Sequence, residues 1–270
     1  MENTEIKNSG SAWKSYSSPA IIALALVAGI VIYVFVMGNP ENFEGGNPAN
    51  HPKAGNVLGL MYKGGKIVPI AMGIFLMLIT FSIERIITLL SAAGKGSMDV
   101  FVHKIQNYLE QDNIEAAMAE CDTQKGSVGN VIKATLRKYK EMSKEQIMDK
   151  EQKILAIQKS LEEATALELP MLEKNLTIIA TIVSIGTLIG LIGTVLGMIA
   201  AFSALATAGA PDAVALANGI SEALINTAIG ITTSTIATIA YNYFTSSIDT
   251  MSYRIDEAGY SIVQTFGSKY

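Results

Sequence analysis

The stretch NGISEALINTAIG, residues 218–230, places one carboxylic acid in a strongly apolar part of the chain. Glu222 stands near its middle, and Asn218 and Asn226 lie four residues to either side. An ionised carboxylate inside a bilayer costs from about 3 to more than 10 kcal/mol. The cost falls if the carboxyl is protonated or if it faces a hydrated pathway. Both describe a residue that can take up and release a proton, and the alternative is a neutral acid that joins helices.

Further polar side chains lie on the same predicted helix. At about 100° per residue they form two flanks, one around Glu222 and one about 120–160° from it. The flank of Glu222 also holds Asn218, Asn226 and Thr233, and the second flank consists of Thr227, Ser234 and Thr238. A helix that is polar on two sides cannot face lipid all round. We expect one flank to pack on the preceding apolar helix and the other to face a cavity or another subunit.

The composition indicates a membrane protein. Of the 270 residues, 50% are hydrophobic and 16% are charged, against roughly 25% charged residues in an average soluble domain. The net charge of -4 argues against nucleic acid as a partner. Cys121 is the single cysteine, so it cannot form an intrachain disulfide and is expected to be a small core residue. The sequence has no Cys/His cluster at metal spacing and no phosphate-binding glycine loop, so we expect neither an enzyme nor a cofactor.

Four apolar stretches qualify, or nearly so, as spanning helices of about 20 residues. We expect an all-α polytopic membrane protein with transmembrane helices at residues 19–37, 67–91, 172–206 and 213–246. The third stretch is too long for a bilayer of ~30 Å at ~1.5 Å per residue, so its helix should project from the membrane. A turn at 207–212 would make the last two spans an antiparallel hairpin. The first span lacks an A-x-A-like cleavage site, so we expect a retained anchor in place of a signal peptide.

The lysines and arginines orient the chain. They place three sections in the cytoplasm: the N-terminus at 1–18, a helical domain at 92–171 and a tail at 247–270. The loop at 38–66 and the turn at 207–212 are then periplasmic.

The ends of the cytoplasmic helices carry further signals. Ser143 and Gln146 fit a capping box. Pro170 should kink or interrupt the last helix before the third span. Glu84 and Arg85 close the second span and should snorkel to the interface or pair with a neighbouring helix.

The third span carries a stripe of small residues. Its glycines lie within about 60° of one another around the helix, and they are Gly186, Gly190, Gly193 and Gly197. Small residues at this spacing let another helix backbone approach closely. Thr194 lies on a flank of the stripe, where its hydroxyl could simply bond back to a carbonyl of its own helix.

Several segments resemble the ExbB/TolQ proton-channel family, which is distantly related to MotA. These segments are IGLIGTVLGM, GISEALINTAIG followed by YN, FSIERIITL at the end of the second span, and LEKNLTIIATI before the third. The resemblance covers about residues 65–248 and is strongest over 173–242. It implies a homopentamer in the inner membrane of a Gram-negative bacterium, in which the subunits surround the membrane helices of an ExbD/TolR-like partner dimer. Proton flow would move that partner and energise a TonB- or TolA-like protein that reaches the outer membrane.

The resemblance also implies roles for single residues. Glu222 matches the membrane glutamate of the family, and Thr194 and Thr227 match its two pore-associated threonines. Helical phase alone does not bring Thr227 beside Glu222, so the pore assignment comes from the resemblance.

The chain departs from the family pattern at four places. Gly186-Thr187 replaces a common Ala-Pro, Ile236 replaces a proline, Asn226 replaces a small residue, and the first span is additional. Without the prolines, the third and fourth spans should be straighter. Asn226 adds an oxygen beside Glu222, so sodium ions are the alternative to protons. The additional helix should lie at the periphery of the subunit.

Several functions fit these features. The leading hypothesis is an ExbB-type subunit that drives energised outer-membrane transport, and the next is a TolQ-like or gliding-motor stator with the same ion chemistry. MotA itself fits the surroundings of Glu222 less well. A membrane scaffold in which Glu222 only joins helices is a different class of function. A secondary transporter would require inverted repeats, which we do not find in the sequence.

Overall fold

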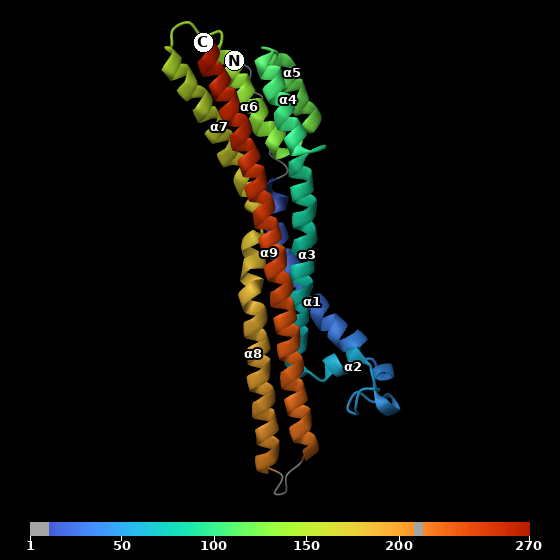
Figure 1. Ribbon diagram of the computed structural model, residues 1–270. Coiled ribbons are helices and arrows are strands. Elements are labelled where there is room, and N and C mark those ends of the chain that lie inside the picture. Colours follow the sequence, from blue (N-terminus) through green and yellow to red (C-terminus); the bar gives the residue numbers. More distant parts are fainter. Residues whose placement is uncertain (1–10, 208–212) are drawn as a thin grey trace. The chain divides into compact units, whose positions relative to one another are not determined.

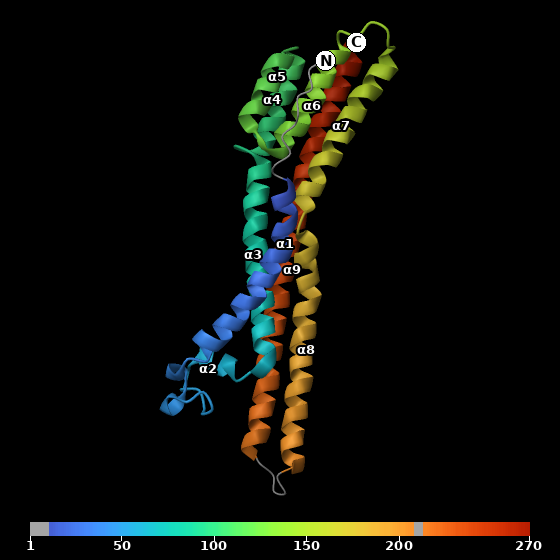
Figure 2. The same cartoon turned by 180° about the vertical axis from the view of Figure 1, so that it is seen from behind.

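The computed structural model describes residues 11–207 and 213–270, which form helices, turns and loops (Figure 1; Figure 2 from behind). Within these ranges the one extended pairing is an isolated bridge between Phe43 and Pro52. Four helical segments are long and apolar enough to cross a membrane, namely Pro19–Met37, Gly65–Glu110, Lys150–Ser203 and Leu216–Lys269. The prediction of an all-α polytopic membrane protein with four spanning helices is confirmed. The turn expected at 207–212 lies outside the described residues after Thr207, as do residues 1–10 of the expected N-terminal section.

The chain divides into two compact units. The first combines the chain up to Ile83 with Ile178–Tyr241, and the second combines Glu84–Thr177 with Asn242–Tyr270. α3 (Val68–Ala93) and α9 (Ala213–Lys269) contribute long stretches to both units. Each unit is therefore built from segments that lie far apart in the sequence.

The first unit contains the apolar helices. α1 (Ser11–Val31) continues as a π-helix over Ile32–Met37, so the expected first span does not keep one regular helix to its end. α1 packs on α3 where two glycines meet, because a Cβ added to Gly29 would lie only 2.7 Å from the backbone nitrogen of Gly73. α8 (Leu176–Thr207) and the first part of α9 run side by side (Figure 1, Figure 2), and both are continuous helices.

The segment between α1 and α3 is folded and contains a helix of its own, α2 (Val57–Tyr62). Asn42 Nδ2 donates to the carbonyls of Val36 at 2.8 Å and Met37 at 2.9 Å. These carbonyls end the π-helix and would otherwise have no partner. The rings of Tyr33 and Tyr62 stack with their centroids 4.7 Å apart. The segment expected as a polar periplasmic loop therefore forms an ordered connection that leads the chain to the start of α3.

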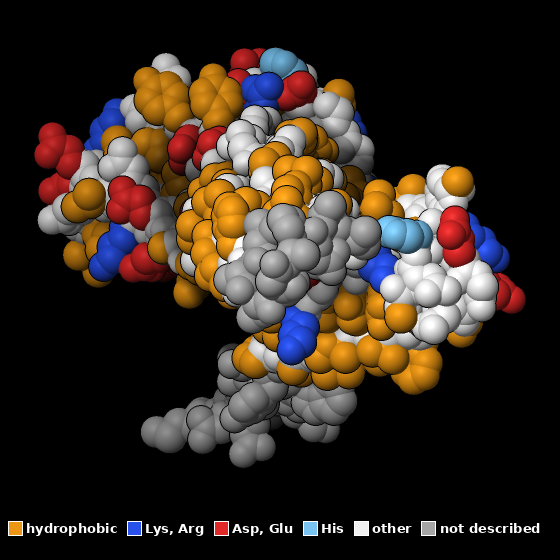
Figure 3. All heavy atoms as spheres, turned by 90° about the horizontal axis from the view of Figure 1, so that it is seen from below, with side chains coloured by type: hydrophobic (Ala, Val, Ile, Leu, Met, Phe, Trp, Pro, Cys, Tyr) orange, Lys and Arg blue, Asp and Glu red, His pale blue; other side chains and the backbone are white. Residues whose placement is uncertain are grey.

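Hydrophobic side chains remain on the outside of the spanning helices. They cover much of the surface that Figure 3 shows. Along α8 the exposed ones include Leu188, Leu191, Val195, Ile199 and Phe202. An apolar surface of this extent requires lipid or other protein chains around it.

The second unit is a helical bundle. It contains α4 (Met98–Glu110), α5 (Ile114–Gln124), α6 (Gly126–Met142), α7 (Lys150–Glu173) and the end of α9. Its core includes Ile105, Leu109, Ile132, Leu136 and Ile157, each at most 2% exposed. These helices stand where the sequence predicts a helical domain at 92–171.

The last part of the chain completes this bundle. The sequence predicts a cytoplasmic tail at residues 247–270, and in the structure α9 continues through this section to Lys269. Its buried residues recur every three or four positions, and they are Ile248, Met251, Ile255, Ala258, Ile262 and Phe266. Phe266 packs edge-on against Tyr139 with ring centroids 5.0 Å apart, and Arg254 pairs with Asp99 at 2.6 Å. This apolar stripe is visible in the sequence and predicts a packed helix when it is read with the helical period.

The predicted capping box at Ser143 and Gln146 is wrong. α6 continues through Met142, which is buried, and Ser143 forms its C-terminal cap. The capping box lies at Asp149 and Gln152, where the Asp149 carboxylate accepts from the Gln152 backbone N–H at 2.8 Å. Both positions satisfy the sequence pattern. The burial of Met142 in the bundle extends α6 as far as the first of them, so Ser143 ends one helix and does not begin the next.

Arg85 joins the end of α3 to the end of α7. α7 includes Pro170 and ends three residues later at Glu173, so the interruption falls after the proline, where Asn175 has a φ of 65°. The Arg85 side chain is 1% exposed, and its Nη1 donates to the carbonyl of Leu172 at 2.9 Å. That carbonyl is among the last four of α7, which have no partner within the helix. Arg85 also binds Glu84 with Nη2 at 2.5 Å and Nε at 2.7 Å. Of the two expected arrangements, pairing with a neighbouring helix is therefore the one adopted.

Replacing Arg85 should destabilise the second unit. Arg85→Met keeps the apolar stem but leaves the Leu172 carbonyl without its donor and the Glu84 carboxylate without its ion-pair partner. We expect a loss of about 2 kcal/mol in the free energy of unfolding, since a hydrogen bond to a charged group contributes about 1.5–3 kcal/mol. Thermal unfolding of the detergent-solubilised protein measures this loss. Arg137→Met, at an exposed position of α6, is the matched control, and equal unfolding temperatures for the two variants would contradict the role of Arg85.

Candidate functional site

The glycine stripe of α8 lies against the backbone of α9. A Cβ added to Gly197 would lie 2.8 Å from the backbone nitrogen of Ala223, and one on Gly190 would lie 3.2 Å from the carbonyl of Asn226. Gly230 makes the matching contact from α9. A Cβ added to it would lie 2.6 Å from the Gly186 carbonyl and 2.8 Å from the Cα of Gly190. The two backbones thus approach as closely as small residues allow. This approach fixes which side chains of α9 face α8.

One polar flank of α9 faces α8. Thr227 and Thr194 are hydrogen-bonded to each other through their hydroxyls. Ser234 accepts a hydrogen bond from Thr187 at 2.9 Å. Thr194 also reaches back to the carbonyl of Gly190 at 3.2 Å, as threonines inside helices often do. The structure thus brings together the two threonines that the family resemblance selects, across the interface of α8 and α9.

The other flank of α9 faces the start of α3. Glu222 is half-buried, and its carboxyl lies against Gly65, where an added Cβ would overlap it. Gly65 has a φ of 75°, a conformation that glycine adopts readily and other residues rarely do. None of the ion pairs between described residues includes Glu222. Its carboxyl therefore meets a backbone segment and no cation within the described subunit.

Asn226 and Asn218 have different surroundings. Asn226 is 1% exposed, and its Nδ2 donates to the carbonyl of Gly64 at 2.7 Å. Asn218 is exposed. The Oδ1 of Asn226 is buried and has no hydrogen-bond partner among the described residues. Glu222 and Asn226 thus both contact the Gly64–Gly65 segment, one turn of α9 apart.

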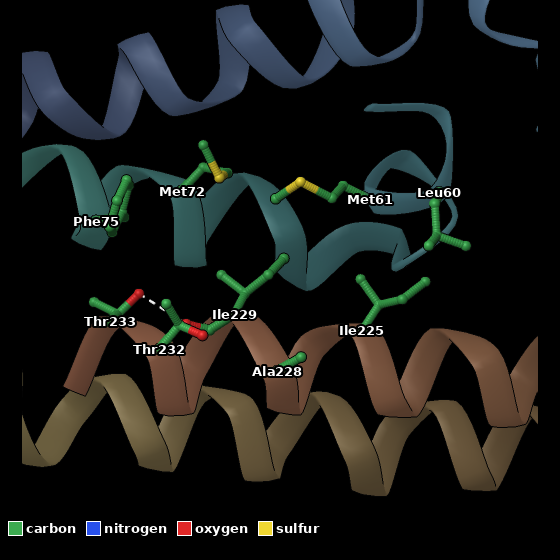
Figure 4. A pocket seen from close by; sticks show the side chains of 9 residues that line it. All are labelled: Leu60, Met61, Met72, Phe75, Ile225, Ala228, Ile229, Thr232 and Thr233. Carbon is green, nitrogen blue, oxygen red and sulfur yellow. Dashed lines mark hydrogen bonds between the residues drawn. The ribbon is translucent and has the colours of Figure 1, made fainter. Parts of the chain in front are cut away.

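An apolar pocket of about 340 Å³ lies between α9 and the α2–α3 region (Figure 4). Its lining residues are Leu60, Met61, Met72, Phe75, Ile225, Ala228, Ile229, Thr232 and Thr233. None of these nine side chains is a carboxylate, an imidazole or an amine, so the pocket itself offers no carrier for protons. A route for ions would use the polar residues on either side of it.

A second hollow of about 580 Å³ lies on the outer face of α8, and it is lined by Thr194, Val195, Met198, Ile199, Phe202 and Ser203. Because Thr194 is also hydrogen-bonded to Thr227, the hollow borders this pair of threonines. The remaining lining is mainly apolar, as suits a helix of another chain or a lipid.

The other candidate residues do not assemble into a site. Cys121 is buried, and this burial raises the pKa of its thiol to about 12, which leaves it unreactive as a core residue. His51 and His103 are exposed. In the part of the chain that the structure describes, no group of three or more metal-binding side chains occurs.

Comparison with known proteins decides the family. The model of the MotA/TolQ/ExbB proton channel family matches residues 123–257, half of the 270-residue chain. The chain belongs to the MotA/TolQ/ExbB family. It is similar to the Tol-Pal system protein TolQ of Pseudomonas aeruginosa, with 26% identity over 154 residues that make up 57% of this chain and 67% of that protein.

Membership of the MotA/TolQ/ExbB family confirms the expected class of function. The chain is a multi-pass membrane protein of a proton-channel family, and it is not an enzyme. The matched region contains α8 and the part of α9 with Glu222, Asn226 and Thr227. Their roles in conduction stay predictions from the sequence.

Gly64 and Gly65 belong to the site, although the sequence does not single them out. They belong to the segment YKGGK directly before the second span. A glycine pair before a helix signals a turn, but nothing local indicates that it lies against a carboxyl more than 150 residues further along the chain.

Two glycines of α9 should respond in opposite ways to an added methyl group. Gly230→Ala pushes a Cβ into the backbone of Gly186 and Gly190, which cannot move aside, so we expect a loss of about 1–3 kcal/mol in stability. Gly267→Ala has room, with Ile154 Cδ1 at 3.4 Å, and should gain about 0.5–1 kcal/mol from helix propensity. Thermal unfolding of both variants in the same detergent tests this. The same shift in both would show that the contact of α8 with α9 does not limit stability.

Proposed function

We propose that this chain is the ion-conducting subunit of an inner-membrane motor, in which protons pass by way of Glu222 and drive a partner protein. The observation that carries the proposal is the position of Glu222. It is the single charged residue in the apolar stretches 175–211 and 213–248, and no cation neutralises it within the described subunit. An acid held in a membrane at this cost is expected to be functional.

The conducting unit in this proposal is an oligomer of five copies around a partner. α8 exposes apolar residues along its length and has the hollow beside Thr194. In the proposed assembly this face meets a single-span partner of the ExbD/TolR kind, present as a dimer. A partner is needed because one acid in the membrane does not make a complete path, and the partner's membrane helix would supply the second.

The proposed work is the energising of outer-membrane transport through a TonB-like protein, as in an ExbB–ExbD motor of a Gram-negative bacterium. The alternative is a TolQ-like subunit acting on a TolA-like protein, favoured by the similarity to the TolQ of Pseudomonas aeruginosa. A gliding-motor stator would use the same chemistry. Identification of the protein that co-purifies with the chain from native membranes decides which of these partner systems the chain drives.

Protons are the proposed ions, and sodium ions are the alternative. The alternative rests on Asn226, whose buried Oδ1 is an oxygen without a hydrogen-bond partner among the described residues. Flux driven by a proton gradient in sodium-free buffer supports protons, whereas flux that depends on added sodium supports the alternative.

The proposal predicts that Glu222→Gln stops ion flux while the complex stays assembled. The amide keeps the size and polarity of the carboxyl but cannot carry a proton, so the flux into liposomes that contain the complex should fall by about 10²-fold or more. Asp249→Asn, at an exposed acid further along α9, is the matched control and should conduct normally. Size-exclusion chromatography checks assembly. Normal flux through an assembled Glu222→Gln complex would support the scaffold hypothesis instead.

A further inference from the structure

The Gly64–Gly65 segment covers the polar flank of α9, and we call it the glycine cover. Gly65 leaves no space between its backbone and the Glu222 carboxyl, as described above. Gly64 is equally confined, because an added Cβ would lie 2.5 Å from Val68 Cγ2 and 3.0 Å from Ile225 Cγ2. Both positions therefore require glycine, one for its φ and its contact with Glu222, the other for the narrow space between α3 and α9.

Asn226 holds this cover from the side of α9. Its amide donates to the Gly64 carbonyl at 2.7 Å. On the opposite side, a Cβ added to Gly193 would lie 2.6 Å from Asn226 Cγ and 2.8 Å from its Nδ2. The backbone of α8 thus backs the amide and keeps it directed at Gly64. A smaller residue at position 226 would leave the Gly64 carbonyl without its donor.

Side-chain packing next to the cover is loose. Leu60 and Met61, which precede the cover, face Ile225 across the apolar pocket of about 340 Å³ (Figure 4). The chain before the cover is therefore not pressed onto α9 at this place. Among the described residues, the hydrogen bond from Asn226 is a polar contact between the cover and α9.

We propose that Asn226 is a positioning residue, which holds the glycine cover over the Glu222 carboxyl and so limits access of water and ions to it from the side of α2. This inference rests on the proposed role of Glu222. Without Asn226 the Gly64 carbonyl would have to find water, because a buried carbonyl without a partner is costly. The cover would then move away from α9 and open the carboxyl to water.

Asn218 provides the matched control. It is the same residue type at the same four-residue distance from Glu222 in the opposite direction, and it is exposed. If any asparagine one turn from Glu222 affected its access, Asn218→Ala and Asn226→Ala would behave alike. If the cover matters, only the second variant changes access.

The test measures access to Glu222 directly. The complex, assembled in lipid nanodiscs, is treated at one pH with a water-soluble carbodiimide and an added amine, and the modification of Glu222 is followed over time by peptide mass spectrometry. We expect Asn226→Ala to raise the rate at Glu222 about fivefold, the effect of losing one hydrogen bond on a local opening. Asn218→Ala should match the unchanged protein. Modification of Glu84, in the second unit, should be equal in all samples and reports any general loosening.

A second variant keeps the test decisive if Asn226→Ala does not assemble. Gly65→Ala leaves Asn226 in place but forces the cover and the carboxyl apart, so it should also raise the rate at Glu222. An unchanged rate at Glu222 in either assembled variant, or an equal rise at Glu84, would overturn the inference. These rates do not depend on ion flux, so the result is separate from that of Glu222→Gln, which tests the proposed function itself.

Discussion

The close approach of the α8 and α9 backbones determines the rest of the site. In a membrane, helices associate through van der Waals contact and not through the exclusion of water, so the glycines on both sides of this contact decide how α9 is rotated. With Gly190 and Gly230 in contact, Thr227 turns towards Thr194 and Glu222 turns away towards Gly65. A different rotation of α9 would separate the threonines and expose the acid to another surface.

α9 also contributes to both units of the chain. Its first part carries the polar flanks of the membrane unit, and its last part is buried in the helical bundle with Ile255, Ile262 and Phe266. α9 is one helix over both parts, so its backbone hydrogen bonds continue from the first unit into the second.

Much of the fold follows from local patterns. Apolar length predicts the spanning helices. Within the helical domain, Phe101, Ile105 and Leu109 recur every four residues, which is typical of one face of a helix, and all three are buried in α4. The capping box was predicted at the wrong position because the same short pattern occurs at Ser143 and at Asp149. Only the burial of Met142 in the bundle selects between these two positions. The end of α9 has an apolar stripe in the sequence, but which helices this stripe packs against depends on the tertiary structure.

The sequence by itself determined that the chain crosses a membrane with a single acid in its last two apolar stretches, and the motifs around Glu222 indicated the family that the family model confirms. Composition and periodicity suffice for this because transfer into lipid depends on each residue's own polarity. Only the tertiary structure decided between the two asparagines that flank Glu222 at equal spacing. Asn218 is exposed and Asn226 is buried against the carbonyl of Gly64, since the difference depends on a backbone segment 162 residues away that no local pattern places there.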